Sequence, residues 1–113
     1  MKTILLFFTF LLFYVYQCKT DKHKIDIIPE QKMILILTDV MIAESAINFE
    51  QGQQKEIAAY TNYYYSVVFD KYKITKKQFE ENMQFYSKNN KDFNEMFLKV
   101  IANLNSPSAK NRF

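Results

Sequence analysis

The stretch PEQKMILILTDVMIAESAIN, residues 29–48, decides the fold of this 113-residue chain. A helical spacing of i, i+3, i+4 and i+7 links its main apolar residues, which are Met33, Ile36, Leu37, Val40, Met41 and Ile47. Further apolar residues between them widen the stripe beyond one face. A helix that is apolar around most of its circumference must be largely buried, by its own domain or by a partner. We therefore expect a central helix from Pro29 to about Asn48.

Three further helices are predicted downstream, over residues 54–72, 76–87 and 91–104. The second of these begins with a capping box, in which Thr75 is the N-cap and Gln78 follows three residues later. The chain has one glycine and two prolines, which argues against a turn-rich β fold. Because short links favour antiparallel neighbours, we predict an all-α fold. It is a small up-and-down bundle of three to four helices after an N-terminal signal segment.

The N-terminus has the pattern of a bacterial lipoprotein signal. A short cationic start precedes an uncharged apolar run at residues 3–17, and Cys18, the only cysteine, follows it. This run is shorter than the about 20 residues that span a bilayer, which favours a secretory signal. We expect residues 1–17 to be removed and Cys18 to be lipidated. The alternative is an uncleaved inner-membrane anchor, because Tyr16 and Gln17 are bulkier than the residues that usually precede a lipidated cysteine.

The domain organisation follows from this start. We expect a polar tether at residues 18–27, a helical domain at residues 28–105 and a flexible tail at residues 106–113. Lys19, directly after the cysteine, favours the outer membrane, and the scarcity of acidic residues after it favours the periplasmic face. Without residues 1–17, 14 basic and 12 acidic side chains remain, a net charge of +2. Since the two signs are interspersed, no nucleic-acid partner is expected.

We find no pattern typical of catalysis, cofactor binding or metal binding. His23 is the only histidine and lies in the expected tether, far from any predicted core. A phosphate-binding loop needs more than one glycine, and no cluster of Cys, His or Asp has metal-ligand spacing. The sequence therefore predicts a protein that is not an enzyme and uses no cofactor.

Asp39 and Glu44 are the most informative polar residues, because they interrupt the most apolar helix. One interpretation places both on the solvent side of that helix, Asp39 with Thr38 and Glu44 with Asn48. The other places one of them half-buried against a lysine or a tyrosine. There it either fixes the packing of the second helix or contacts a partner.

Three consecutive tyrosines, Tyr63, Tyr64 and Tyr65, lie on the second predicted helix. They cannot all point inward, so at least one phenol should face water or a partner. Aromatic residues at helical spacing are typical of a core, but tyrosine is also frequent in protein–protein interfaces. Together with the widely apolar first helix, the tyrosines suggest an exposed apolar face. The candidate interaction residues are therefore Asp39, Glu44 and these three tyrosines.

Two blocks of this sequence resemble a known family. The first reads IPEQKM at residues 28–33 and ILTDV at residues 36–40, followed by Ala43 and Glu44. The second reads YYSVVFDKYKIT at residues 64–75, followed by Gln78-Phe79, Phe85-Tyr86 and VIANL at residues 100–104. They resemble a family of small bacterial lipoproteins known as domain of unknown function 4296, over about residues 27–104. The resemblance implies a lipidation cysteine, in agreement with Cys18, and no established activity.

From these features we expect a lipid-anchored periplasmic protein without catalytic activity. Its partners would be the membrane, through Cys18, and a protein of the cell envelope, for which it serves as an interaction or accessory subunit. The alternative is a binding protein for a small apolar ligand held between the first and second helices. By analogy with helical periplasmic folding factors, the bound molecule would otherwise be an unfolded chain.

Overall fold

The computed structural model describes residues 23–53 and 56–112. Their helices are α2 at Glu30–Gly52, α3 at Ile57–Tyr72, α4 at Lys76–Ser87, α5 at Asn90–Leu104 and the short 3-10 helix η1 at Pro107–Asn111. These residues contain no strand, so the fold is all-α, as expected. The expected signal peptide, residues 1–17, and Cys18 lie outside the described residues.

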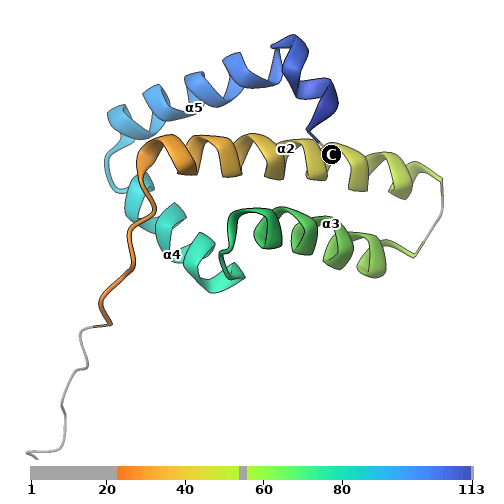
Figure 1. The fold of residues 1–113 in the computed structure, drawn as a ribbon, viewed down its shortest axis with the longest axis horizontal. Coiled ribbons are helices and arrows are strands. Elements are labelled where there is room, and N and C mark those ends of the chain that lie inside the picture. Colours follow the sequence, from red (N-terminus) through yellow and green to blue (C-terminus); the bar gives the residue numbers. More distant parts are fainter. Residues whose placement is uncertain (1–22, 54–55, 113) are drawn as a thin grey trace, which may run out of the picture.

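Helix α2 is the central element of the bundle (Figure 1). It packs against α3 on one side and against α5 on the other, and α4 contacts α5. Helices α2 and α3 run antiparallel, whereas α5 runs in the same direction as α2 (Figure 1). The shorter α4 connects α3 to α5 across the end of the bundle where α2 begins. The predicted bundle is therefore present.

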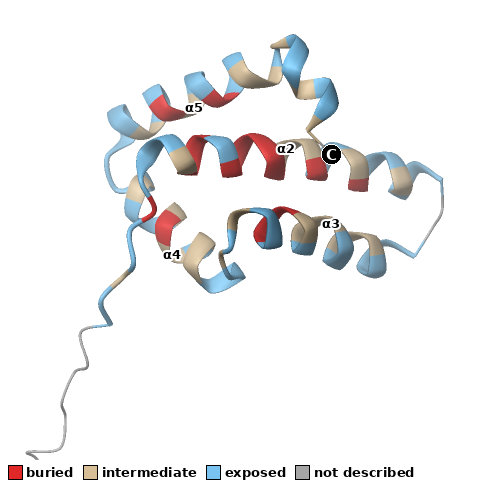
Figure 2. Ribbon diagram, in the orientation of Figure 1, coloured by how far each residue is buried: buried red, intermediate tan, exposed pale blue. Residues whose placement is uncertain are grey.

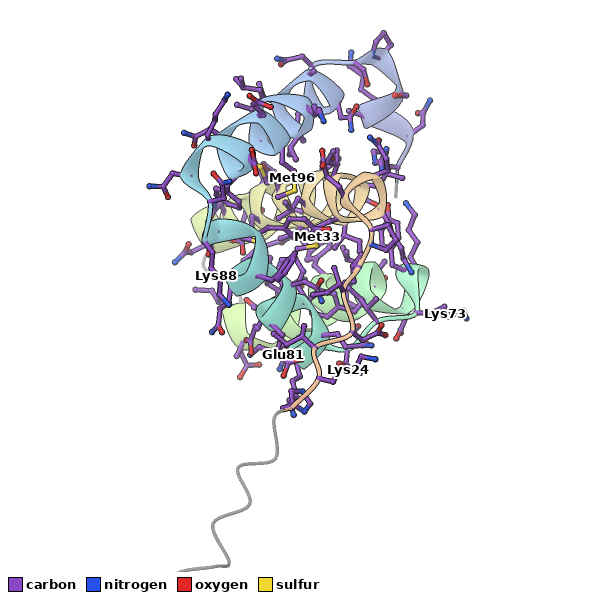
Figure 3. The ribbon with its side chains drawn as sticks, turned by 90° about the vertical axis from the view of Figure 1, so that its left-hand side faces the viewer. Lys24, Met33, Lys73, Glu81, Lys88 and Met96 are labelled. Carbon is purple, nitrogen blue, oxygen red and sulfur yellow. The ribbon has the colours of Figure 1, made fainter. Side chains whose placement is uncertain are left out.

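Burial is concentrated on α2 (Figure 2). Nine of its residues are buried, which are Met33, Ile34, Ile36, Leu37, Thr38, Asp39, Val40, Ala43 and Ile47. Helix α3 adds Val68 and Phe69, and α5 adds Met96 and Val100. Figure 3 shows Met33 and Met96 in the interior. Because neighbouring helices cover α2 from two sides, a stripe wider than one face is what its position requires.

Local sequence signals account for the start of α4. The Gln78 amide donates to the Thr75 hydroxyl oxygen at 3.1 Å, and the Thr75 amide donates to the Gln78 side-chain oxygen at 2.9 Å. This is the predicted capping box. Helix α5 begins at Asn90, one residue earlier than expected, because the Asn89 side chain caps it by accepting from the Lys91 and Asp92 amides.

The link between α2 and α3 differs from the prediction. Helix α2 continues to Gly52 rather than ending near Asn48, and α3 begins at Ile57 rather than near Gln54. Polar residues at the end of α2 are compatible with a helix, and Gly52 does not adopt the positive φ that ends many helices. Composition alone therefore placed the helix end too early.

The turn between α3 and α4 is tight. Lys73 adopts a left-handed conformation with φ 56°, and the Ile74 amide donates to the Phe69 carbonyl at 3.0 Å. This pattern satisfies carbonyls at the end of α3, and three residues then link it to α4. It fixes the direction in which α4 leaves α3.

Candidate functional site

Asp39 is the centre of a polar cluster that joins α2, α3 and the C-terminal residues. Its side chain is 0% exposed. Its Oδ2 accepts hydrogen bonds from the Lys71 Nζ at 2.8 Å and from the Tyr72 hydroxyl at 2.7 Å. Its Oδ1 accepts from the Arg112 Nε. The solvent-side interpretation is therefore wrong for Asp39, and also for Thr38, which is buried. A contact of Asp39 with a partner stays a prediction.

Arg112 brings the C-terminal segment onto this cluster. Its Nη2 donates to the Tyr72 hydroxyl at 3.1 Å, and its carbonyl accepts from the Lys71 Nζ at 3.2 Å. Pro107 opens η1, whose residues lead the chain back from α5 to α2. The flexible tail expected at residues 106–113 is therefore wrong for residues 107–112. A polar sequence is typical of a flexible tail, but the buried Asp39 carboxylate on α2 binds Arg112, the last described residue of this segment.

The protonation states of the cluster follow from these contacts. Burial raises the pKa of the Asp39 carboxyl, but the hydrogen bonds from Arg112, Lys71 and Tyr72 outweigh this, so its pKa lies below the usual 3.8. Burial, with the hydrogen bond to Asp39, raises the pKa of Tyr72 to about 12. The hydrogen bond to Asp39 also raises the pKa of the Arg112 guanidinium. At neutral pH, the ionised Asp39 carboxylate thus faces the Arg112 guanidinium and the neutral phenol of Tyr72.

This arrangement suits structural cohesion. A general base needs a pKa near the working pH and an oxygen that can reach a substrate proton. Both Asp39 oxygens accept hydrogen bonds from this chain's own residues, and the pKa is shifted away from neutrality. The geometry therefore makes Asp39 a fixed anion that joins three segments of the chain.

Glu44 lies in a different environment from Asp39. Both Glu44 and Asn48 are exposed on α2, as the solvent-side interpretation predicts. The Tyr65 hydroxyl of α3 donates a hydrogen bond to the Glu44 Oε1. Glu44 therefore contributes a contact between α2 and α3 at the rim of the bundle. The structure does not bring Asp39 and Glu44 to one site.

The three tyrosines point in different directions. Tyr63 is 62% exposed, as expected for at least one of them. Its ring packs edge-on against Tyr64, with centroids 5.5 Å apart. Tyr64 and Tyr65 are partly buried and pack against the core. Only Tyr63 therefore presents most of its side chain to the surface.

The residues before α2 form a docked segment at residues 23–28, which the sequence analysis missed. Asn82 of α4 is completely buried, and its side chain accepts from the Ile28 amide at 2.8 Å and donates to the Asp26 carbonyl at 2.9 Å. The Tyr86 hydroxyl donates to the Ile28 carbonyl. His23 contacts Glu81, with its Nε2 2.8 Å from the Oε1.

The polar tether expected at residues 18–27 is therefore docked on α4 at residues 23–27, and residues 18–22 lie outside the described residues. One signal for this contact is present in the sequence. Asn82 follows Phe79 by three residues and precedes Tyr86 by four, so it lies on the inner stripe of α4. A polar residue on such a stripe needs a buried partner.

A hollow of about 290 Å³ lies between α3 and α4. Its lining residues are Thr61, Asn62, Tyr65, Phe69, Lys76, Phe79 and Glu80. The walls combine aromatic rings with a lysine and a glutamate at the edge of α4. Its position differs from the expected ligand site, which was between the first and second helices.

Two further properties of residues 23–53 and 56–112 bear on the expectations. These residues hold no group of three or more His, Cys, Asp or Glu side chains that is placed to bind a metal ion. They also hold no helix whose length and apolar character would let it cross a membrane.

Comparison with known proteins gives one relationship. Residues 25–110 match the model of the family described as domain of unknown function (DUF4296). No curated protein and no solved structure matches the chain. The matched region covers α2 to α5 and most of the docked segment. Since it spans well over half of the sequence, the chain belongs to the DUF4296 family.

Proposed function

We propose that this protein is a lipid-anchored interaction subunit of the bacterial cell envelope, without catalytic activity of its own. The observation that carries the proposal is the exposure of large apolar side chains on three helices. Phe49 of α2 is 66% exposed, Tyr63 of α3 is 62% exposed and Leu98 of α5 is 65% exposed. Large apolar and aromatic side chains on a surface are typical of protein interfaces.

The N-terminal pattern supports the anchor. An uncharged run ends at Cys18, and no other cysteine occurs in the chain. Several acyl chains on one cysteine give stable membrane attachment, which a single chain does not. Lys19 supports the outer membrane, and the scarcity of acidic residues after it supports the periplasmic face. In this proposal the membrane is one partner and an envelope protein is the other.

Two measurements test the two parts separately. Intact mass of protein extracted from membranes tests the anchor, with Cys18→Ala as control. A mass that corresponds to residues 18–113 plus acyl chains supports the anchor. A mass that shows a wild-type chain with residues 1–17 retained and no acylation contradicts it.

The partner is tested by cross-linking. A photo-reactive amino acid replaces Phe49, Tyr63 or Leu98 in intact envelopes. Lys88 and Lys91, which are exposed and polar, are the matched control positions.

The expected result is one discrete adduct from at least one apolar position and none from the controls. The yield of this adduct should fall when another of these three apolar residues is replaced by serine. A monomeric protein with no adduct from any of the three positions contradicts the interaction role.

A second candidate function is the binding of a small apolar ligand. The hollow between α3 and α4 supports it, because its volume of about 290 Å³ is just below the usual size of ligand pockets, about 300–1,000 Å³. Decanoate is a suitable probe, since it pairs an apolar chain with a carboxylate that Lys76 can meet. Thr61→Phe should fill the hollow, and Ser66→Phe adds the same ring at an exposed position of α3.

Ligand binding predicts that decanoate raises the melting temperature of the wild type and of Ser66→Phe, but not that of Thr61→Phe. No shift in the wild type, with no bound lipid in native mass spectra, contradicts this candidate.

A further inference from the structure

The docked segment changes how the domain is connected to its N-terminus. Residues 23–28 contact α4 through Asn82, Tyr86 and Glu81. The Ile28 side chain is buried in the core cluster. Each bond between this segment and α4 links positions more than 50 residues apart, so these bonds anchor the segment to the tertiary structure.

Covalent geometry then limits the distance between Cys18 and the domain. Only five peptide units separate Cys18 from His23, the first described residue. At about 3.3–3.6 Å per residue they reach at most about 18 Å. If residues 18–28 were a free tether, the same limit would be about 36 Å. Docking therefore halves the longest possible connection.

The docked segment and α5 lie at opposite sides of the bundle. The segment runs from the start of α2 past α4 and away from α5 (Figure 1). Figure 3 places Lys24 and Glu81 together at one edge, whereas Met96 lies toward the opposite side. Helix α4 lies on the α3 side of α2, and α5 packs on the other side of α2 (Figure 1), so about two interhelical spacings of about 8–10 Å each separate α4 from α5 beyond the turn that joins them. With a helix radius of about 5 Å, the outer face of α5 is roughly 23 Å from the α4 edge.

We propose that the docked segment orients the domain on the membrane, with the α4 edge facing the lipid headgroups and the outer face of α5 directed away from them. This inference rests on the lipid anchor at Cys18 in the proposed function. The opposite orientation would require a connection of roughly 23 Å, longer than the about 18 Å that five fully extended peptide units span. Leu98 and Ile101, which are exposed on α5, are then accessible to a protein in the aqueous compartment.

Paramagnetic relaxation enhancement tests this orientation without a second cysteine. The chain of residues 18–113 contains all described helices and their contacts. Its Cys18 is alkylated with a two-chain lipid halide, which forms a thioether without a spacer, and the ¹⁵N-labelled protein is placed in nanodiscs that carry a gadolinium chelate on a headgroup lipid. We expect a several-fold larger enhancement at the amides of Lys77 and Glu81 than at those of Leu98 and Ile101.

Two variants weaken the docking. Asn82→Ala removes the bonds to Asp26 and Ile28, and Tyr86→Phe removes only the hydroxyl that donates to the Ile28 carbonyl. Both variants should reduce the difference in enhancement between the α4 and α5 amides, and Asn82→Ala should reduce it more strongly. Asn94→Ala, at an exposed asparagine of α5, should leave it unchanged. If Asn82→Ala does not fold, Tyr86→Phe decides.

Equal or reversed enhancement in the wild type overturns the inference. The inference is also overturned if both docking variants keep the full difference in enhancement between α4 and α5. Because the lipid is attached chemically, these results do not depend on acylation in the cell. If the protein is acylated in the cell but the enhancement is equal at the α4 and α5 amides, only the orientation is overturned. If the protein is not acylated in the cell but the enhancement is larger at α4, only the anchor is overturned.

Discussion

Replacement of Arg112 tests whether the C-terminal segment is part of the folded domain. In Arg112→Ala, the Oδ1 of Asp39 loses its donor, while its Oδ2 keeps Lys71 and Tyr72. A hydrogen bond to a charged group contributes about 1.5–3 kcal/mol, and the Asp39 side chain is 0% exposed. Because the Arg112 side chain is 18% exposed, water can partly replace it. We therefore expect a loss of about 2 kcal/mol.

For a domain of this size, 1 kcal/mol shifts the melting temperature by about 4–8 °C, so Arg112→Ala should melt about 8–16 °C lower. Calorimetry measures this, with Lys110→Ala as matched control, since Lys110 is exposed in the same 3-10 helix. A double-mutant cycle with Asp39→Asn should give a coupling energy of about 1–2 kcal/mol. Equal melting temperatures for Arg112→Ala and Lys110→Ala would refute the structural role of Arg112.

The effect of Arg112 should also depend on pH. The pKa of Asp39 in the folded protein lies below the 3.8 expected in the unfolded chain. The stability from its ionised form is therefore present above about pH 4 and is lost as the pH falls through the folded pKa. The difference between wild type and Arg112→Ala should be largest at neutral pH and shrink below pH 4. A constant difference down to acidic pH would contradict the ion pair as its cause.

Four further predictions follow from the described contacts. Asn82→Ala should lower the free energy of unfolding in urea by about 2–3 kcal/mol, because it leaves the buried Ile28 amide without its acceptor, whereas Asn94→Ala should change it little. Thr75→Ala should cost about 1 kcal/mol in the same assay through loss of the capping box, and an unchanged value would contradict the cap. The pKa of Tyr72 is raised from 10.0 to about 12, so its contribution to stability is present below pH 10 and lost as the pH rises through 12. Tyr72→Phe should therefore lose less stability than the wild type between pH 10 and pH 12, and equal losses in the two proteins would contradict the raised pKa. Gly52→Ala should stabilise the protein by about 0.5–1 kcal/mol, since Gly52 is helical, has no positive φ and leaves open space for a Cβ atom; a lower melting temperature would contradict this.

The sequence predicted those parts of the fold that depend on neighbouring residues. The capping box at Thr75 placed the start of α4 correctly, because both of its hydrogen bonds lie within four residues. The apolar spacing predicted α2 as the central helix, because two-sided burial leaves a wide stripe. The end of α2 was missed, because polar residues after Asn48 are compatible with both a helix and a loop.

The candidate site depended on contacts that spacing does not contain. Helical spacing places Asp39 on one face of α2, but it does not say which residue covers that face. The residue that covers it, Arg112, is 73 positions away, beyond the last predicted helix. The same holds for Asn82 of α4. Its partners Asp26 and Ile28 come before α2 in the sequence and contact α4 only in the folded chain. The polar composition of the segments before α2 and after α5 correctly predicted that they are hydrophilic, but it could not predict that they dock on the helices.

These contacts also change what supports an interaction role. The wide apolar stripe of α2 left open whether its own domain or a partner covers it. In the structure, α3 and α5 cover this stripe, and Arg112 neutralises the acid within it. Intramolecular packing thus already accounts for the composition of α2. A partner surface must therefore be sought at Phe49, Tyr63 and Leu98, which remain exposed after the helices have packed. Cross-linking from these positions consequently tests the proposal more directly than any substitution within α2.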